Sequence, residues 1–191
     1  MDTTGYIKKQ TLYLAILASL VVGFVGGVAY SVYRAPAGTN TQASAQQQQA
    51  AELIASLEQA TEQNPKDATV WIQLGHAYFD SGQAKKAIAT YTKALELQPG
   101  DINVMTDLGV MYHQDNQHQK AIEIFDQVLK IDPEHEQARF NKGVVLLTGL
   151  NDRKAAIAEW KILVRQHPMA AAPSGKMVGD LIEQMEQAKD N

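Results

Sequence analysis

Apolar residues recur at helical spacing from residue 68 to about residue 168, and the same order returns after 34 residues. Counted from Ala68 as position one, the first helical face lies at positions four, seven, eight and eleven, which are Trp71, Leu74, Gly75 and Tyr78. Steps of three and four residues place these side chains on one side of a helix. A second face follows at positions twenty, twenty-four and twenty-seven, with proline at thirty-two; these residues are Ala87, Tyr91, Ala94 and Pro99. The pattern predicts two helices joined by a short turn, and the proline prevents the second helix from continuing.

The next 34 residues repeat this order, and a looser third copy follows. In the second unit the same steps read Met105, Leu108, Gly109, Tyr112, Ala121, Phe125, Val128 and Pro133. In the third unit, which starts at Glu136, Arg139 and Lys142 replace the expected bulky apolar residues, Gly143 keeps position eight and Leu146 stands at the tyrosine position. One extra residue, which we place in the turn around 149–152, restores the phase for Ala156, Trp160, Leu163 and Pro168.

This order of residues resembles the tetratricopeptide repeat (TPR), a helix–turn–helix unit of the same period. The three units are predicted at 68–101, 102–135 and 136–169, the third with its one-residue insertion. Each unit leaves an apolar face that only its neighbour covers, so the resemblance implies an all-α, right-handed superhelical solenoid. A half-repeat over 50–64 and an amphipathic helix over 177–189 are predicted to cap its two ends.

A continuous apolar run occupies the N-terminus. After a short tail of residues 1–10, residues 11–33 carry no charge. A bilayer core needs about 20 apolar residues of helix, so we predict one transmembrane helix over 11–33. A cleaved secretory signal is the alternative, because residues 35–37 read Ala-Pro-Ala, the form of a cleavage site. The apolar region of such signals is usually about 7–15 residues long, which favours the uncleaved anchor.

The charges beside this run predict its orientation. Lys8 and Lys9 precede the run, whereas Arg34 alone follows it. Basic residues favour the cytoplasmic side, so by a margin of one charge the N-terminus is predicted inside and the repeats outside, in the periplasm of a bacterium. Residues 35–49 contain no charge and almost no large apolar group, which predicts a flexible polar linker, although part of the glutamine run is compatible with the helix that follows.

Small residues recur every fourth position within the predicted transmembrane helix: Ala15, Ser19, Gly23, Gly27 and Ser31. They form one helix face along which another helix can approach closely. This face predicts helix–helix pairing, and thus a homo-oligomer through the membrane, unless the small residues only reflect the composition common in membrane helices.

A second stripe on the first helix of each unit lies at positions two, five, nine and twelve. TPR stacks use this concave side to bind partners, and the resemblance therefore implies a partner-binding groove lined by Thr69, Ile72, His76, Phe79, Asn103, Thr106, Val110, His113, Gln137, Phe140, Val144 and Leu147. None of the twelve is charged, which suits an extended peptide or an amphipathic helix. The alternative is that neighbouring helices already bury several of them. TPR domains that grip a C-terminal carboxylate carry Lys at position five and Asn at nine, whereas this chain has Ile72 and His76.

Composition and motifs argue against other classes of function. The net charge is −4 and the soluble part has no basic stripe, so no nucleic-acid partner is expected. The absence of cysteine excludes disulfides and thiol chemistry. Five scattered histidines form no metal motif, although His76 and His113 fall on adjacent first helices, and no phosphate loop or nucleophile with its base is present. We therefore expect no catalytic residue, no metal, no cofactor and no small-molecule substrate.

Together these patterns predict a membrane-anchored TPR adaptor that holds a peptide or protein partner near the membrane. The order of anchor, Gln-rich linker, half-repeat and repeats is similar to the TPR subunits of bacterial cytochrome c maturation, which implies a role in holding the apocytochrome. Two alternatives stay open. One is a structural scaffold that assembles with itself, and the other is an accessory subunit held in a larger membrane complex mainly by its helix.

Overall fold

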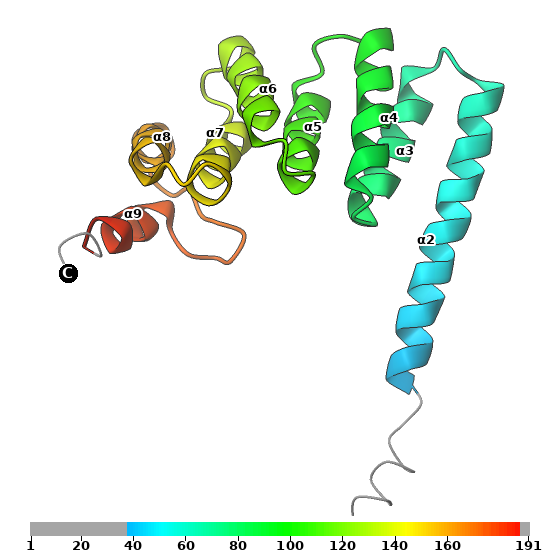
Figure 1. Cartoon of the computed structure of the whole chain (residues 1–191), viewed down its shortest axis with the longest axis horizontal. Coiled ribbons are helices and arrows are strands. Elements are labelled where there is room, and N and C mark those ends of the chain that lie inside the picture. The colour runs from blue at the N-terminus through cyan, green and yellow to red at the C-terminus, as the bar shows by residue number, and fades with distance from the viewer. Residues whose placement is uncertain (1–37, 188–191) are drawn as a thin grey trace, which may run out of the picture. The chain divides into compact units, whose positions relative to one another are not determined.

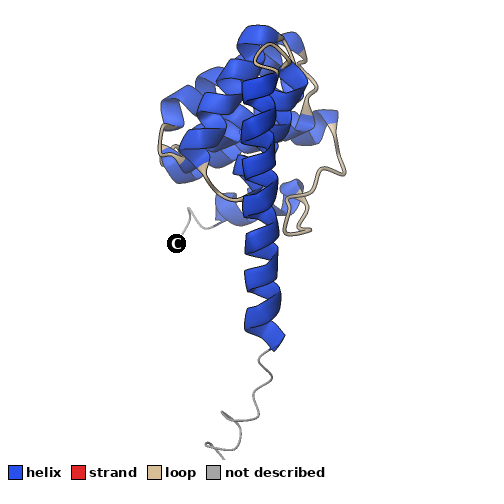
Figure 2. Cartoon of the chain, turned by 90° about the vertical axis from the view of Figure 1, so that its right-hand side faces the viewer, coloured by secondary structure: helices blue, strands red, loops and turns tan. Residues whose placement is uncertain are grey.

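The computed structural model describes residues 38–187. In that range the regular elements are helices, apart from one isolated bridge between Ala171 and Met177 (Figure 2). The helices are α2 (Gly38–Gln63), α3 (Ala68–Asp80), α4 (Ala84–Leu97), α5 (Ile102–Gln114), α6 (His118–Ile131), α7 (Glu136–Val144), the π-helical η1 (Val145–Gly149), α8 (Arg153–Gln166) and α9 (Val178–Gln187). The chain divides into two compact units, Met1–Gln48 and Gln49–Asn191, and the repeats lie in the second. There the prediction of an all-α repeat is confirmed.

The predicted membrane segment lies outside the described residues. Among the helices of residues 38–187, none combines the length and the hydropathy that a membrane span requires. The run 11–33 and its face of small residues therefore stay predictions.

From α3 to α9 the helices follow one another side by side in chain order (Figure 1). The pairs α3–α4, α5–α6 and α7–α8 each correspond to one predicted repeat. Carboxylates begin several of these helices: Asp67 accepts a hydrogen bond from the Thr69 amide at 2.9 Å, and Asp101 accepts one from the Asn103 amide at 3.0 Å. Such caps satisfy amide groups that have no partner inside the helix.

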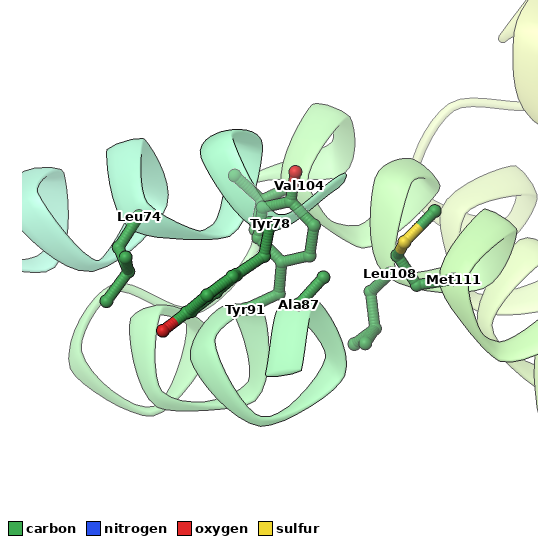
Figure 3. Close-up of a cluster of buried hydrophobic side chains, with 7 residues drawn as sticks. All are labelled: Leu74, Tyr78, Ala87, Tyr91, Val104, Leu108 and Met111. Atoms are coloured by element: carbon green, nitrogen blue, oxygen red, sulfur yellow. The ribbon is translucent and has the colours of Figure 1, made fainter. Parts of the chain in front are cut away.

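Each glycine at position eight faces an aromatic ring of the second helix. A Cβ on Gly109 would lie 2.7 Å from Cε1 of Phe125, and Gly75 faces Tyr91 in the same way. Neither of these rings is exposed, and burial of such a side chain contributes about 1.5–3 kcal/mol. The first core cluster draws on α3, α4 and the next repeat's α5, as Figure 3 shows for Leu74, Tyr78, Ala87, Tyr91, Val104, Leu108 and Met111. The apolar face of a repeat is therefore covered only when the first helix of the next repeat packs against it.

The extra residue of the third unit lies in its first helix, which corrects the sequence-based placement in the turn. The three turns have equal length, with the left-handed residue at the same step: Gly82 (φ 69°), Asn116 (φ 60°) and Asn151 (φ 55°). The additional residue is taken up by η1, where the Leu150 amide donates to the Val145 carbonyl, five residues earlier, at 3.1 Å. A π turn holds one residue more than an α turn and so absorbs an insertion without lengthening the loop.

The polar residues that make the third unit irregular form an ion network. Arg139 Nη1 lies 3.0 Å from Glu159 Oε2, and Lys142 Nζ lies 2.6 Å from Glu159 Oε1 and 2.7 Å from Asp126. Arg139 also donates to the Pro133 carbonyl at 2.6 Å, six residues earlier. Trp71, at the same position of the first unit, donates to the Pro65 carbonyl at 3.0 Å. Arg139 thus keeps the hydrogen bond of the tryptophan that it replaces.

The linker prediction needs correction from residue 38 onward, because α2 already begins at Gly38 within the predicted flexible segment 35–49. Alanine and glutamine are good helix formers, and a helix satisfies its own backbone without a core. Further along α2, Ile54 and Leu57 pack on the first core cluster, whereas Leu53 is 53% exposed. At the other end, α9 buries Val178 and Ile182 against the last repeat.

Candidate partner-binding face

The first helices of the three repeats form one layer. Helix α3 contacts α5, and α5 contacts α7, whereas no comparable contact joins α4 to α6 or α6 to α8 within residues 38–187. In a curved stack the layer whose helices approach each other lies on the inner side. We call the accessible side of α3, α5 and α7 the inner face.

The twelve predicted groove residues differ in their exposure. Four are exposed: Thr69, His76, Asn103 and Gln137. Seven are half-buried: Ile72, Phe79, Val110, His113, Phe140, Val144 and Leu147. Ile72, Phe79 and Val110 pack at the edge of the first core cluster, which still leaves part of each side chain accessible.

The prediction that Thr106 contacts a partner is wrong. It is 1% exposed, and its hydroxyl donates to the Ile102 carbonyl at 2.7 Å. Its small side chain packs where α5 meets its neighbours, so a partner cannot reach it. The sequence placed Thr106 on the correct helix, but the position within a stripe does not determine how closely the next helix approaches.

The third unit presents its stripe differently from the first two. Phe140 stacks on Trp160 with ring centroids 5.8 Å apart, and Phe140, Val144 and Leu147 pack against a cluster that includes residues of α8 and α9. Counted back from the turn, the equivalent of Phe79 and His113 is Thr148, because η1 moves the register by one residue. Thr148 is exposed, whereas Leu147 occupies the step of the tyrosines. Sequence reasoning missed Thr148 because it placed the insertion after that residue.

A carboxylate that sequence reasoning also missed lies beside the stripe. Asp107 of α5 lies 3.4 Å from His76 Nε2 of α3. Burial raises the pKa of the Asp107 carboxyl, and the nearby His76 opposes this shift. The buried Tyr91 hydroxyl also lies within reach of this charge but makes no hydrogen bond of normal geometry to a described residue. The sequence did contain a signal for this residue, because Asp107 is the one carboxylate in α5, the first helix of the second repeat.

His113 pairs with a histidine of the following helix. Its Nδ1 lies 3.0 Å from Nδ1 of His118, and the ring centroids are 4.9 Å apart. Burial lowers the pKa of His113, and the neighbouring His118 lowers it further. The structure thus joins His113 to His118 and His76 to Asp107. Among residues 38–187, no three His, Asp or Glu side chains are grouped as metal ligands.

Two hollows of the described chain lie elsewhere, between α8 and α9. Their volumes are about 680 and 700 Å³, and both are lined by Ala158 and Lys161. Ile157 and Met185 line the first hollow, and Ile182 lines the second. They mark the end of the stack, where a short helix covers α8 incompletely.

Solved structures with the same fold include TPR domains. A crystal structure of MamA matches with a TM-score of 0.64 and 18% identity, over 72% of this chain and 77% of that chain. The structure described as MamA MSR-1 C2 matches at 0.59 and 25% identity, over 76% and 80%. The first TPR domain of Spaghetti (RPAP3), bound to the HSP90 peptide SRMEEVD, matches at 0.56 and 18% identity, over 65% and 94%. A comparison with curated proteins gave no match.

A family model places the chain more narrowly than these structures, which establish the fold. The model describes the TPR domain of cytochrome c-type biogenesis protein H, and it matches residues 30–172, more than half of the chain. The matched range contains all three helix pairs and the register of their glycines and prolines. This chain therefore belongs to the family of cytochrome c-type biogenesis protein H TPR domains (CcmH/CycH).

Proposed function

We propose that this protein is a membrane-anchored, non-catalytic scaffold of bacterial cytochrome c maturation, which holds a polypeptide client, the apocytochrome, along its inner face. The observation that supports it most directly is the row of accessible side chains on α3 and α5. His76, Asn103 and Thr69 are exposed there, and Ile72 and Phe79 keep part of their apolar surface accessible. A row of this kind offers both hydrogen bonds and apolar contacts to an extended or helical segment.

Asp107 gives this face a preferred kind of contact. Its carboxylate is half-buried and the charge is costly there, as the raised pKa indicates. His76, at 3.4 Å, is a distant partner that leaves hydrogen-bonding capacity on the carboxylate. A client segment with an N–H donor or a basic side chain would supply the missing hydrogen bond, and charge-assisted bonds are the stronger ones.

The N-terminal part would hold this face at the membrane. Residues 11–33 would form the anchor, with the N-terminus in the cytoplasm and the repeats in the periplasm. Anchoring raises the effective concentration of a bound client near membrane partners. A reporter that is active only outside the cytoplasm, fused after Asn191, should be active; a silent fusion contradicts this orientation.

Site-specific photocrosslinking in cells tests client binding. A photoreactive phenylalanine at Phe79 should capture a c-type apocytochrome, identified by mass spectrometry, because this side chain lies on the inner face. The matched control is the same group at Ala89, an exposed residue of α4. Asp107→Asn should lower the yield at Phe79 without lowering the amount of protein. Equal capture at Ala89 and Phe79 would exclude the inner face as the binding surface, and crosslinks only between copies of this chain would favour self-assembly.

A further inference from the structure

Two imidazoles face each other across the turn of the second repeat. His113 lies in the last turn of α5 and His118 begins α6, so the three-residue turn brings the rings together. Their Nδ1 atoms are 3.0 Å apart, and the ring planes are tilted by 52°. On the far side, a Cβ on Gly149 of η1 would lie 2.6 Å from Cγ of His118. The absence of a side chain at Gly149 therefore leaves room for this ring.

The hydrogen bonds of the next repeat determine which nitrogen of His113 is free. The Thr148 hydroxyl donates its single proton to the Val144 carbonyl at 2.8 Å. Toward His113 Nε2, which lies 3.3 Å away, the same hydroxyl can only accept. His113 therefore carries its proton on Nε2, and its Nδ1 presents a lone pair to His118. In the metal-free protein, His118 Nδ1 must donate the shared proton.

His113 thus has the arrangement that histidine ligands of metal ions usually have. A ligating imidazole usually donates its second N–H to a fixed acceptor, which holds the ring and its tautomer in place. Imidazole nitrogens lie about 2.0–2.1 Å from such ions, and two of them 3.0 Å apart then subtend an angle of about 91–97° at the ion. Adjacent positions of a square-planar or octahedral ion require about 90°, as Cu²⁺ and Ni²⁺ prefer. Tetrahedral Zn²⁺ would need the nitrogens to be about 0.3 Å further apart.

We propose that His113 and His118 form a two-histidine binding site for a divalent transition-metal ion, with Cu²⁺ bound more tightly than Ni²⁺ or Zn²⁺. The ion takes the place of the proton that His118 Nδ1 donates to His113. That proton moves to Nε2 of His118, so no net proton is released. The proposal is independent of client binding.

The remaining coordination positions of the ion are open. Within the described residues no carboxylate and no third imidazole joins the two histidines to complete a ligand group. Asp115, in the same turn, accepts a hydrogen bond from Gln117 at 2.6 Å. Water would therefore occupy the other positions, and the site is expected to bind less tightly than a site with three or four protein ligands.

Titration of the full-length protein in detergent with Cu²⁺, Ni²⁺ and Zn²⁺ against a competing chelator tests the site. One ion per chain is expected, with affinity in the order Cu²⁺, then Ni²⁺, then Zn²⁺. His113→Gln and His118→Gln should each lower the affinity at least tenfold, whereas His76→Gln should leave it unchanged. Circular dichroism confirms that each variant is folded. The proposal is overturned by the absence of stoichiometric binding, by equal affinity of the three ions, or by a loss that His76→Gln shares.

Thr148 provides a test of the geometry. As a positioning residue it acts through His113, so Thr148→Val should weaken binding several-fold and Thr148→Ser should restore it. Nitrogen-15 spectra of the histidine rings add an independent readout. The metal-free protein should show His113 protonated on Nε2, and Zn²⁺ should shift both Nδ1 signals. Protonation of His113 on Nδ1, or Zn²⁺ shifts confined to other histidines, would overturn the assignment.

Discussion

Replacing Gly143 by alanine should destabilise the last repeat, although alanine is normally the better helix residue. Gly143 lies in α7 against the indole of Trp160, which is 4% exposed. A Cβ at this position would overlap Nε1 of the indole and lie 2.6 Å from Cδ1. To reach van der Waals distance the ring must move by about 1 Å. That movement also pulls Nε1 away from the Phe140 carbonyl, which it contacts at 3.0 Å.

Three effects determine the size of the change at Gly143. Overpacking a buried site costs about 1–3 kcal/mol. Loss of the indole hydrogen bond, with the carbonyl left buried, costs about 1 kcal/mol or more. Alanine returns about 1 kcal/mol through its helix propensity. The free energy of unfolding should therefore fall by about 2 kcal/mol.

Gly179 provides the matched control, because it lies in α9 with open space where its Cβ would be. Gly179→Ala should raise the stability by up to about 1 kcal/mol. Urea denaturation of both variants, followed by far-UV circular dichroism and tryptophan fluorescence, gives the comparison. If Gly143→Ala proves as stable as Gly179→Ala, the close approach of the two helices does not limit this repeat. In a Trp160→Phe background the penalty of Gly143→Ala should shrink, since the smaller ring removes the overlap.

The remaining predictions concern charge. Glu159→Ala should lower the free energy of unfolding by about 3 kcal/mol, because it leaves Arg139 buried without its carboxylate. Glu186→Ala removes an exposed ion pair and should cost less than about 1 kcal/mol in the same denaturation experiment. Equal losses in the two variants would refute the stabilising role of the buried ion pair. Burial raises the pKa of Tyr78 to about 12, and its hydrogen bond to Glu58 adds to the shift. The resulting stability is complete below the unfolded pKa of about 10 and is lost as pH rises through 12, by at most about 2–3 kcal/mol. Between pH 10 and 12 the wild type should therefore lose stability faster than Tyr78→Phe, and parallel curves would contradict this.

Sequence alone determined the features that depend on short-range spacing. A period of 34 residues and steps of three and four predicted the helix pairs, their inward faces and their turns. The glycine at position eight recurred in all three units, but only the structure shows that an aromatic ring of the second helix faces it, as Tyr91 faces Gly75. These features follow from the geometry of one helical hairpin, and each hairpin can bury its face only against the next.

Tertiary structure decided what depends on contacts between repeats. The sequence showed that the third unit has one extra residue, but a π turn and a longer loop restore the repeat phase equally well. Only the structure shows that the residue is taken up by η1, which leaves Thr148 exposed. From the sequence, Arg139 replaces an apolar core residue. The structure shows that Glu159, twenty residues later, forms an ion pair with it. Thr106 and His113 share the predicted stripe, yet one is buried and the other meets His118. A periodic pattern specifies the direction of a side chain, whereas its burial and its partners depend on how closely the neighbouring helix packs.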